Sequence, residues 1–591
     1  MKIERMSILS LNQNQRESVF VRKSFRRFFV PSLLSCLGIA VGGLADCVFV
    51  GNVIGPVGLT AISIGQPVYM VFNTISYALS IGGSIHYATA MAEGRREDGI
   101  RIFNNVLRAA LAIYITLCAL GLAFLPQVLT FLGAGTPGTE LWDNCEALVR
   151  AQLLLVPIMF SQGPFLYFIN SDNNPKLGSF AFVVSNTLDV VFNYVFVVVM
   201  DLGVAGSVYS TGVGASVMVL ISMTHFIQKK GSLRFSWPRF DGKVLLQSFK
   251  TGFATAVQYI YQFITILVCN RLLMEMSGEL GVAVFNIVFN VALLAATVYD
   301  ALSMALQPMV STFRGEHNRA NIRATLRLSI EVGMVVSAVL MGVLLIVPGW
   351  VSFAFGLRTQ EELLMGVSAI RIYAVCLLPA GVNMVMNYYY QAMEEEFASY
   401  LLFTLRSFVF YLAFSLLLGR LGAQWFWWLY PCTEAATLAA LLLYGKKRGS
   451  LTLLDNKDDK VFSALLYSKT ANLGQVEQDV AAYMESLEAS PTQAYYASIV
   501  VEEVCGAIMN NAFFFGEGYI QFTIVPHEDK TVTIHVRDDA KRFNPFDLDT
   551  DSIDLDRDAG LDAIGIKMIK SKAKEFFYRR YAGFNTLVVR V

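Results

Sequence analysis

Charged side chains are scarce in this chain of 591 residues. Asp, Glu, Lys and Arg make up 16% of the sequence, whereas a soluble globular chain carries about a quarter. Apolar residues reach 55%, and the mean hydropathy is +0.51. This composition excludes a single soluble enzyme and indicates a membrane protein.

Motifs for metal binding and for ATP-driven transport are also missing. The eight cysteines form no Cys-x-x-Cys pair, so neither a disulfide framework nor a metal site is expected. No Gly-x-x-x-x-Gly-Lys-Ser/Thr loop occurs, which argues against transport driven by ATP hydrolysis.

The zero net charge is an average of two unlike parts. Residues 1–454 contain 31 basic and 24 acidic side chains, whereas residues 455–591 contain 15 and 22. This asymmetry excludes a uniform series of domains and a nucleic-acid binder with one basic face. The chain divides instead into an apolar part and an acidic, soluble part.

Apolar stretches long enough to cross a bilayer of ~30 Å recur as far as residue 444. They predict an all-α membrane part with twelve crossings in two six-helix lobes, the layout of a secondary transporter. The predicted crossings are 28–50, 61–90, 106–125, 148–170, 178–200, 203–227, 251–272, 280–305, 328–347, 371–393, 398–418 and 424–444. The predicted organisation is a tail at 1–27, a first lobe at 28–227, a linker at 228–250, a second lobe at 251–447, a linker at 448–469 and a C-terminal domain at 470–591.

Basic charge alternates between the predicted loops. The N-terminal tail and every second loop contain 25 Lys and Arg residues, and the remaining loops contain 5. The positive-inside rule therefore places both termini in the cytoplasm. The tail has no short apolar region before a cleavage site, so it is expected to be retained.

Ionisable side chains inside a bilayer cost a few kcal/mol each and therefore need a reason. Asp46 lies in the Gly-rich first helix, and Asp189, Asn193 and Asn186 share one face of the fifth. Two interpretations stay open for them, a carboxylate that exchanges H⁺ or Na⁺ and a polar pair that ties helices together. Asp300 either lines a cavity for a cationic substrate or lies near the cytoplasmic end of its helix.

Three other intramembrane groups are expected to be structural. Arg406 and Glu434 have opposite charges in neighbouring predicted helices and are expected to neutralise each other. His86 is expected to be a hydrogen-bonded residue at a helix interface.

The run Gly43–Gly51 (GLADCVFVG) resembles the first helix of MATE-type multidrug and toxin extrusion transporters. The resemblance extends over about 24–447. It is also based on Pro31, Gly55, Leu59-Thr60-Ala61, Pro67, Leu188 to Asn193, Gly203-Val204-Ala205-Gly206, Gln307-Pro308, Arg314-Gly315 and Tyr390-Gln391-Ala392.

The resemblance implies a V-shaped pair of lobes in a bacterial cytoplasmic membrane. It also implies export of small organic cations in exchange for H⁺ or Na⁺, with no cofactor. Asp46 matches the coupling Asp of the family's first helix. The family's Asn-x-x-x-Asp in the fifth helix appears here as Asp189-x-x-x-Asn193, with the two residue types exchanged. The second-lobe acidic pair of another branch has no counterpart, so coupling is expected in the first lobe.

The chain changes character beyond Lys447. Helical patterns at 475–488 and 491–512 precede strand patterns at 519–526 and 531–537, and a last strand pattern covers 584–591. These patterns predict one soluble α/β domain of ordinary size.

This domain contains, in order, Glu503 on a predicted helix, Asp538 after the predicted hairpin, and then Gly560 and Gly565. Their order resembles the histidine-kinase-like (Bergerat) ATPase fold, an α/β sandwich, and anti-sigma-factor serine kinases most closely. The resemblance implies that Glu503 is the catalytic carboxylate that activates water or a hydroxyl group. It also implies that Asp538 binds the adenine amino group and that the glycines cover the phosphates.

Two positions depart from that ATPase family. The Mg²⁺-binding Asn falls on Ala507, and the Gly of the Asp-x-Gly motif falls on Ala540. Alanine cannot coordinate Mg²⁺, so we expect a degenerate domain that binds ATP, ADP or a cytoplasmic protein. The acidic segment 547–558 is expected to be a solvated lid and not a calcium loop, because Ser552 replaces the turn glycine.

Three functions fit these patterns. The first is an exporter of organic cations with a regulatory tail, the second a membrane sensor with a kinase-like output, and the third a lipid-linked saccharide flippase. Ala507 and Ala540 argue against the sensor, and the mainly acidic intramembrane charge argues against the flippase. The sequence therefore favours the exporter.

Overall fold

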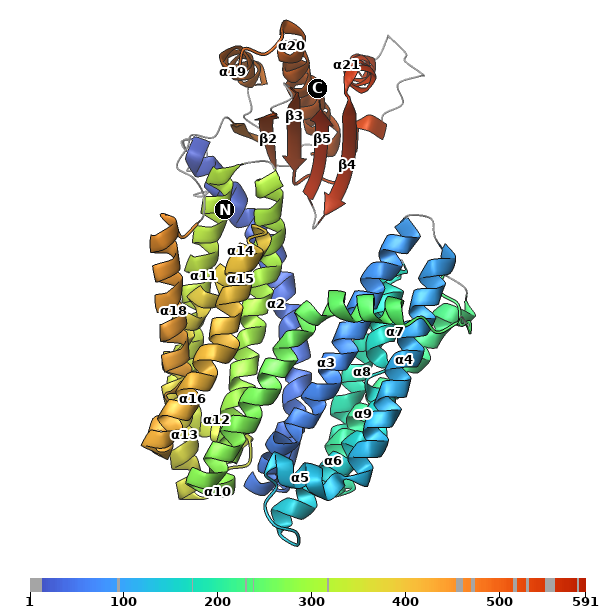
Figure 1. The fold of residues 1–591 in the computed structure, drawn as a ribbon. Coiled ribbons are helices and arrows are strands. Elements are labelled where there is room, and N and C mark those ends of the chain that lie inside the picture. Colours follow the sequence, from blue (N-terminus) through green and yellow to red (C-terminus); the bar gives the residue numbers. More distant parts are fainter. Residues whose placement is uncertain are drawn as a thin grey trace.

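The computed structural model consists of a bundle of long helices with a small α/β domain at one end (Figure 1). We call that end of the bundle the domain end and the opposite one the far end. The structure describes residues 13–92, 96–172, 174–228, 231–237, 239–315, 318–452, 461–468, 473–513, 518–527, 531–547, 559–581 and 584–590.

The bundle helices form two lobes, each with its own apolar core. The lobes approach each other at the far end and diverge toward the domain end (Figure 1). The first lobe contains α3 (Pro56–Ala92), α4 (Arg96–Ala123), α5 (Leu125–Leu132), α6 (Glu140–Met159), α7 (Gln162–Ser171), α8 (Pro175–Asn193), the π-helical η1 (Tyr194–Val199) and α9 (Ala205–Ile227). The second contains α10 (Gly242–Gly315), α11 (Arg319–Ile346), α12 (Pro348–Ala354), α13 (Gln360–Val375), α14 (Leu377–Ala392), α15 (Glu396–Thr404), η2 (Leu405–Val409), α16 (Phe410–Leu421), α17 (Ala423–Phe426) and α18 (Leu429–Arg448).

Helix α2 (Gln13–Val53) contacts α3 and α8 of the first lobe and α10 and α11 of the second. Near the domain end, its Val21 and Phe25 are buried in a cluster formed by helices of the second lobe. The predicted N-terminal tail at 1–27 is therefore helical from Gln13 onward. Hydropathy does not indicate this, because basic residues alternate with the apolar ones that pack.

Helices cover every predicted crossing, but their number is not confirmed. Within the described residues, eight helices are long and apolar enough to cross a membrane, or nine if α13 and α14, bent by 48°, form one span. One of the eight lies in α10 and has 59 residues, which at ~1.5 Å per residue far exceeds a ~30 Å bilayer core. Gly278 interrupts α10 with a φ of 61°, a conformation that glycine adopts without a Cβ clash. Twelve crossings stay a prediction.

The two lobes touch at the far end through the end of α2 and the loop between α12 and α13. The Asn52 side chain donates a hydrogen bond to the Ala354 carbonyl at 2.6 Å and accepts one from Arg358. The backbones are so close that a Cβ added to Gly51 would lie 2.0 Å from the Phe355 carbonyl oxygen. This contact leaves no room for a side chain.

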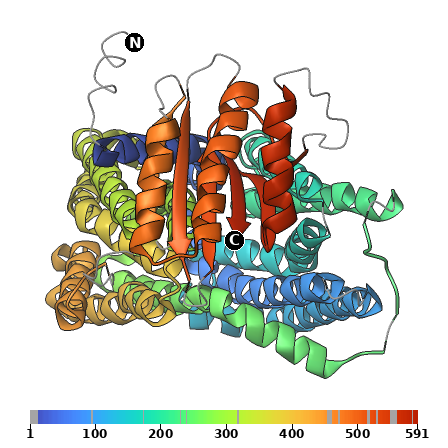
Figure 2. The same ribbon diagram turned by 90° about the horizontal axis from the view of Figure 1, so that it is seen from above.

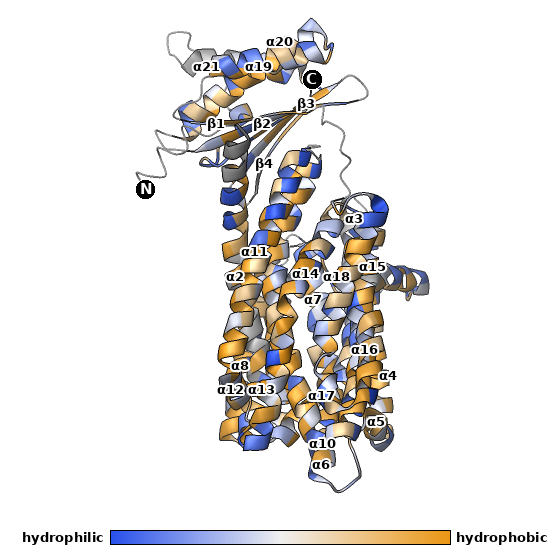
Figure 3. Cartoon of the chain, turned by 90° about the vertical axis from the view of Figure 1, so that its left-hand side faces the viewer, coloured by the Kyte–Doolittle hydropathy of each residue, from blue (hydrophilic) through white to orange (hydrophobic). Residues whose placement is uncertain are grey.

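The C-terminal domain is a five-stranded antiparallel sheet in the order β1-β2-β3-β5-β4. Helices cover one face, and the other face is turned toward the bundle, whose surface is largely hydrophobic (Figure 3). The strands are β1 (Phe462–Tyr467), β2 (Tyr519–Pro526), β3 (Val532–Asp538), β4 (Glu575–Tyr581) and β5 (Phe584–Arg590). The helices are α19 (Leu473–Ser486), α20 (Pro491–Ile499) with η3 (Val500–Cys505) and η4 (Ile508–Ala512), the short η5 (Pro545–Asp547) and α21 (Ala559–Lys572).

The structure confirms three predicted strands as β2, β3 and β5 and the two predicted helices as α19 and α20 with its extension. It adds β1, which lies before the predicted domain boundary at 470 and pairs with β2, and β4 at the sheet edge. The β1–β2 pairing joins residues more than fifty positions apart, whereas β4 forms a local hairpin with β5. Membership of this two-layer domain in the histidine-kinase-like ATPase fold stays a prediction.

Candidate functional site

A cavity of about 450 Å³ lies in the first lobe where it meets α10. Helices α2, α3, α6, α7, α8, α9 and α10 contribute its walls. Asp46, Asp189 and Asn186 all line it, so the structure brings together three of the residues predicted for ion coupling. The other polar side chains in the lining include Gln66, Tyr69, Asn73, Tyr77, Gln152, Gln162, Tyr167, Thr211, Asn286 and Asn290.

The two carboxylates of the cavity have different partners. Asp46 accepts a hydrogen bond from Asn193, which is fully buried behind the cavity wall. Asp189 accepts one from Ser210 of α9 at 2.8 Å. Asp189 and Asn193 therefore share a face of α8 without bonding each other, and Asn193 positions the carboxylate of α2. The helix becomes π-helical directly after Asn193, a local change that is frequent at functional sites.

The cavity suits a positively charged ligand. It contains two carboxylates, and its described lining includes no Lys, Arg or His. Tyr77 also faces aromatic neighbours, with ring centroids 6.0 Å from Tyr167 and 4.8 Å from Tyr259 of α10. Carboxylates and aromatic faces both attract cations.

Sequence reasoning missed the polar stripe of α3. Tyr69, Asn73 and Tyr77 are spaced four residues apart, so they lie on one helix face and reach the same cavity. Four-residue spacing of polar groups in an apolar helix was the signal that would have found them.

Asp300 lies apart from the other predicted coupling residues. It lies in the part of α10 that follows the interruption at Gly278, and its carboxylate accepts a hydrogen bond from Tyr388 of α14. It does not belong to the described lining of the cavity.

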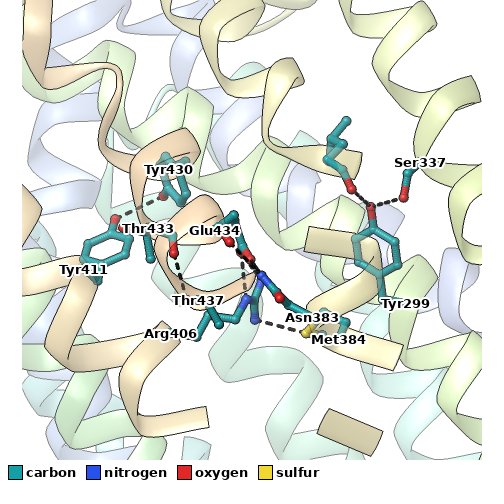
Figure 4. Close-up of polar contacts among 11 residues, drawn as sticks. Tyr299, Ser337, Asn383, Met384, Arg406, Tyr411, Tyr430, Thr433, Glu434 and Thr437 are labelled. Atoms are coloured by element: carbon teal, nitrogen blue, oxygen red, sulfur yellow. Dashed lines mark hydrogen bonds and ion pairs between the residues drawn. The ribbon is translucent and has the colours of Figure 1, made fainter. Parts of the chain in front are cut away.

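Arg406 and Glu434 form the predicted ion pair in the second lobe, at 2.7 Å (Figure 4). The side chain of Asn383 donates a second hydrogen bond to Glu434 at 2.8 Å, and Arg406 contacts the Met384 sulfur at 3.0 Å. The buried carboxylate of Glu434 thus has a close counter-ion and a hydrogen-bond donor, which together compensate for its loss of water. His86 is also confirmed as an interface residue, 2.9 Å from the Thr251 hydroxyl.

Two of the predicted nucleotide-binding residues, Glu503 and Gly565, are in contact in the C-terminal domain. Gly565 of α21 packs so tightly on Glu503 that an added Cβ would lie 2.1 Å from its carboxyl carbon. Asp538 is buried and accepts hydrogen bonds from the Asn585 side chain at 2.7 Å and the Ala540 amide at 3.0 Å. Burial, followed by the nearby Asp538 charge, raises the pKa of the Cys505 thiol beside them.

The remaining predicted features of the nucleotide site are Ala507, Gly560 and the acidic segment. Ala507 is fully buried in the domain core. Gly560 belongs to α21. Most of the acidic segment, 548–558, lies outside the described residues.

Two helical lobes, apolar spans and a polar cavity at their seam define a multi-pass membrane protein with the architecture of a transporter. The family model described as MatE matches residues 31–195 and 251–417. The chain belongs to this family of transporters.

Curated relatives are distant and match only part of the chain. The multidrug export protein MepA of Staphylococcus saprophyticus is 21% identical over 304 residues, which cover 50% of this chain and 65% of the relative. The probable multidrug resistance protein YoeA of Bacillus subtilis is 22% identical over 249 residues, which cover 41% and 53%. The chain thus spans less than two thirds of the length of either.

Solved structures share the fold. An inward-facing multidrug resistance MATE family transporter superposes with a TM-score of 0.64 at 19% identity, covering 69% of this chain and 94% of that one. An outward-facing structure of such a transporter gives 0.56 at 18% identity, with 73% and 97% covered.

Proposed function

We propose that the protein exports small organic cations from bacterial cells by exchange for H⁺ or Na⁺, coupled through Asp46 and Asp189. The single observation that carries this proposal is the cavity in which both carboxylates face a lining without basic side chains. The names of the MepA and YoeA relatives are consistent with multidrug export. Because Arg406 already neutralises Glu434, we infer that ion coupling takes place in the first lobe and not at this pair.

We also propose that the domain end and both termini are cytoplasmic. The basic loops favour this orientation. The lobes are in contact at the far end and diverge toward the domain end (Figure 1). In this orientation the cavity would be accessible to substrate from the cytoplasm.

Efflux of ethidium from energised vesicles tests the proposal. H⁺ and Na⁺ gradients are imposed separately on vesicles that contain the full chain. Efflux driven by one of them identifies the coupling ion, and efflux driven by neither would overturn the proposal.

The C-terminal domain is proposed to regulate transport through α2. Lys23 of α2 forms an ion pair with Asp539, and Phe20 contacts Phe584 with ring centroids 5.7 Å apart. Arg27 lies over the same Phe584 ring at 4.9 Å. The domain thus holds one end of the helix that contains Asp46, and a nucleotide or a cytoplasmic protein bound to the domain would act on that helix.

A degenerate nucleotide site is favoured over an active kinase. Ala507 stands where the fold would need its Mg²⁺ ligand, and it is buried among apolar side chains. Asn585 and the Ala540 amide already bond one oxygen of Asp538. Weak binding of adenine nucleotide without turnover is the activity that these contacts support.

A further inference from the structure

The segment between α9 and α10 is fixed to the domain end of the first lobe. We call residues 231–237 and 239–241 the strap. The Asp172 carboxylate accepts hydrogen bonds from the Ser232 and Leu233 amides at 2.9 and 3.0 Å, and the Leu233 side chain is fully buried. Asn104 accepts a hydrogen bond from the Ser236 amide at 3.0 Å. The strap is an ordered part of the lobe.

Two large apolar side chains nevertheless point away from the protein. Trp237 is 89% exposed and Phe240 is 64% exposed. The Arg108 guanidinium lies over the Trp237 ring at 5.6 Å. Large exposed apolar groups on an ordered segment mark a surface that another phase or molecule covers.

The same surface is basic. Lys243, Leu246 and Lys250 share one face at the start of α10, with Leu246 55% exposed. The nearby acidic Asp241 is neutralised by Arg101 at 2.8 Å. Within the part of the chain that the structure describes, no carboxylate lies within ion-pair distance of Lys243, Lys250 or the exposed Arg239. We define the strap patch as Trp237, Arg239, Phe240, Lys243, Leu246 and Lys250.

The strap runs along the outer edge of the first lobe in the view down the bundle (Figure 2). Helix ends at the edge of a membrane bundle lie beside lipid headgroups. Trp is enriched there, and Lys and Arg side chains form ion pairs with the lipid phosphates. We propose that the strap patch is a binding site for anionic phospholipids, with Trp237, Phe240 and Leu246 at the acyl boundary and the three basic side chains on the phosphates. This proposal depends on membrane insertion and not on the proposed export activity.

Fluorescence quenching in vesicles tests the site. The full-length protein and its Trp237→Phe variant are reconstituted in phosphatidylcholine that contains brominated phosphatidylglycerol or brominated phosphatidylcholine, and the difference signal isolates Trp237. We expect the anionic lipid to quench this signal at a mole fraction roughly tenfold lower than the neutral one, because three basic groups attract it.

Charge variants separate the patch from general charge effects. Replacing Arg239, Lys243 and Lys250 by Gln is expected to abolish the preference for the anionic lipid. Replacing Lys446, Lys447 and Arg448, three basic residues at the end of α18, by Gln is the matched control and should preserve it. Equal quenching by both lipids, quenching by neither, or relief by millimolar glycerol phosphate would overturn the proposal, the last by assigning the patch to a free anion.

Discussion

Asp46, Asp189 and Glu434 are carboxylates within the helical bundle, and they differ in the groups that neutralise their charge. Glu434 has the Arg406 guanidinium at 2.7 Å. Within the described residues, Asp46 accepts a hydrogen bond from the neutral Asn193, and Asp189 accepts hydrogen bonds from the neutral Ser210 and Thr211. An ion or a cationic substrate therefore changes the charge balance at the first-lobe pair far more than at Glu434.

Asp46→Asn is expected to abolish ethidium efflux driven by the ion gradient, because the neutral amide cannot exchange an ion. The variant should still fold, since an amide oxygen accepts the Asn193 hydrogen bond. Asp143→Asn, at an exposed carboxylate of α6, is the control. Normal efflux by Asp46→Asn, measured in the same vesicles, would remove Asp46 from the mechanism.

Glu434→Gln is expected to destabilise the protein by about 3 kcal/mol, because it leaves the Arg406 charge without its counter-ion. Thermal unfolding in detergent measures the change. A double variant with Arg406→Met and Glu434→Leu should recover most of the loss, since it removes both charges. Unchanged stability of the single variant would contradict the structural role of the pair.

At the scale of elements, α2 connects the far end, the cavity and the C-terminal domain. Its far end touches the α12–α13 loop, its middle contains Asp46, and its domain end contacts the sheet. A change at one of these three attachments can therefore reach the others through α2, and the close contact at Gly51 is the attachment at the far end.

Gly51→Ala is expected to separate the lobes at the far end, because the new Cβ would lie 2.0 Å from the Phe355 carbonyl oxygen. Cys47, which lines the cavity, should then react several-fold faster with an impermeant maleimide added at the far end. Cys47→Ser identifies the labelled residue. Gly342→Ala, where an added Cβ has no neighbour within 4 Å, should label at the original rate, and equal rates for both variants would exclude a gate at Gly51.

On the scale of the whole molecule, the C-terminal domain contacts the bundle through an interface of charged, polar and aromatic side chains. Its ion pair involves a Lys23 side chain that is 41% exposed, so the pair contributes about 1 kcal/mol or less. The aromatic contacts of Phe20 and Phe584 add apolar burial. An interface of this kind is suited to release and rebinding.

Lys23→Glu is expected to increase protease cleavage between the bundle and the C-terminal domain, because repulsion from Asp539 releases the domain. Asp539→Lys in the same chain should reverse the effect by restoring opposite charges. Arg22→Glu changes an exposed neighbour and serves as the matched control. Faster cleavage in that control, or no rescue by the swap, would show that the ion pair does not hold the domain.

The full chain is expected to bind ATP weakly and with little dependence on Mg²⁺, because alanine occupies the position of the metal ligand. Calorimetry with and without Mg²⁺ measures binding, and phosphate release measures turnover, which should be negligible. Robust Mg²⁺-dependent hydrolysis that Glu503→Ala abolishes would instead support a signalling kinase.

The sequence by itself determined the class of the protein and the identity of Asp46 as a candidate. Hydropathy, charge alternation and a lone carboxylate in an apolar helix are sums of local transfer free energies, so they can be read residue by residue. Only the tertiary structure decided which groups meet. It paired Asp46 with Asn193, 147 residues away, separated Asp300 from the cavity, and placed β1 and Phe584 where they complete the sheet and hold α2. Such contacts depend on distances that no local pattern encodes.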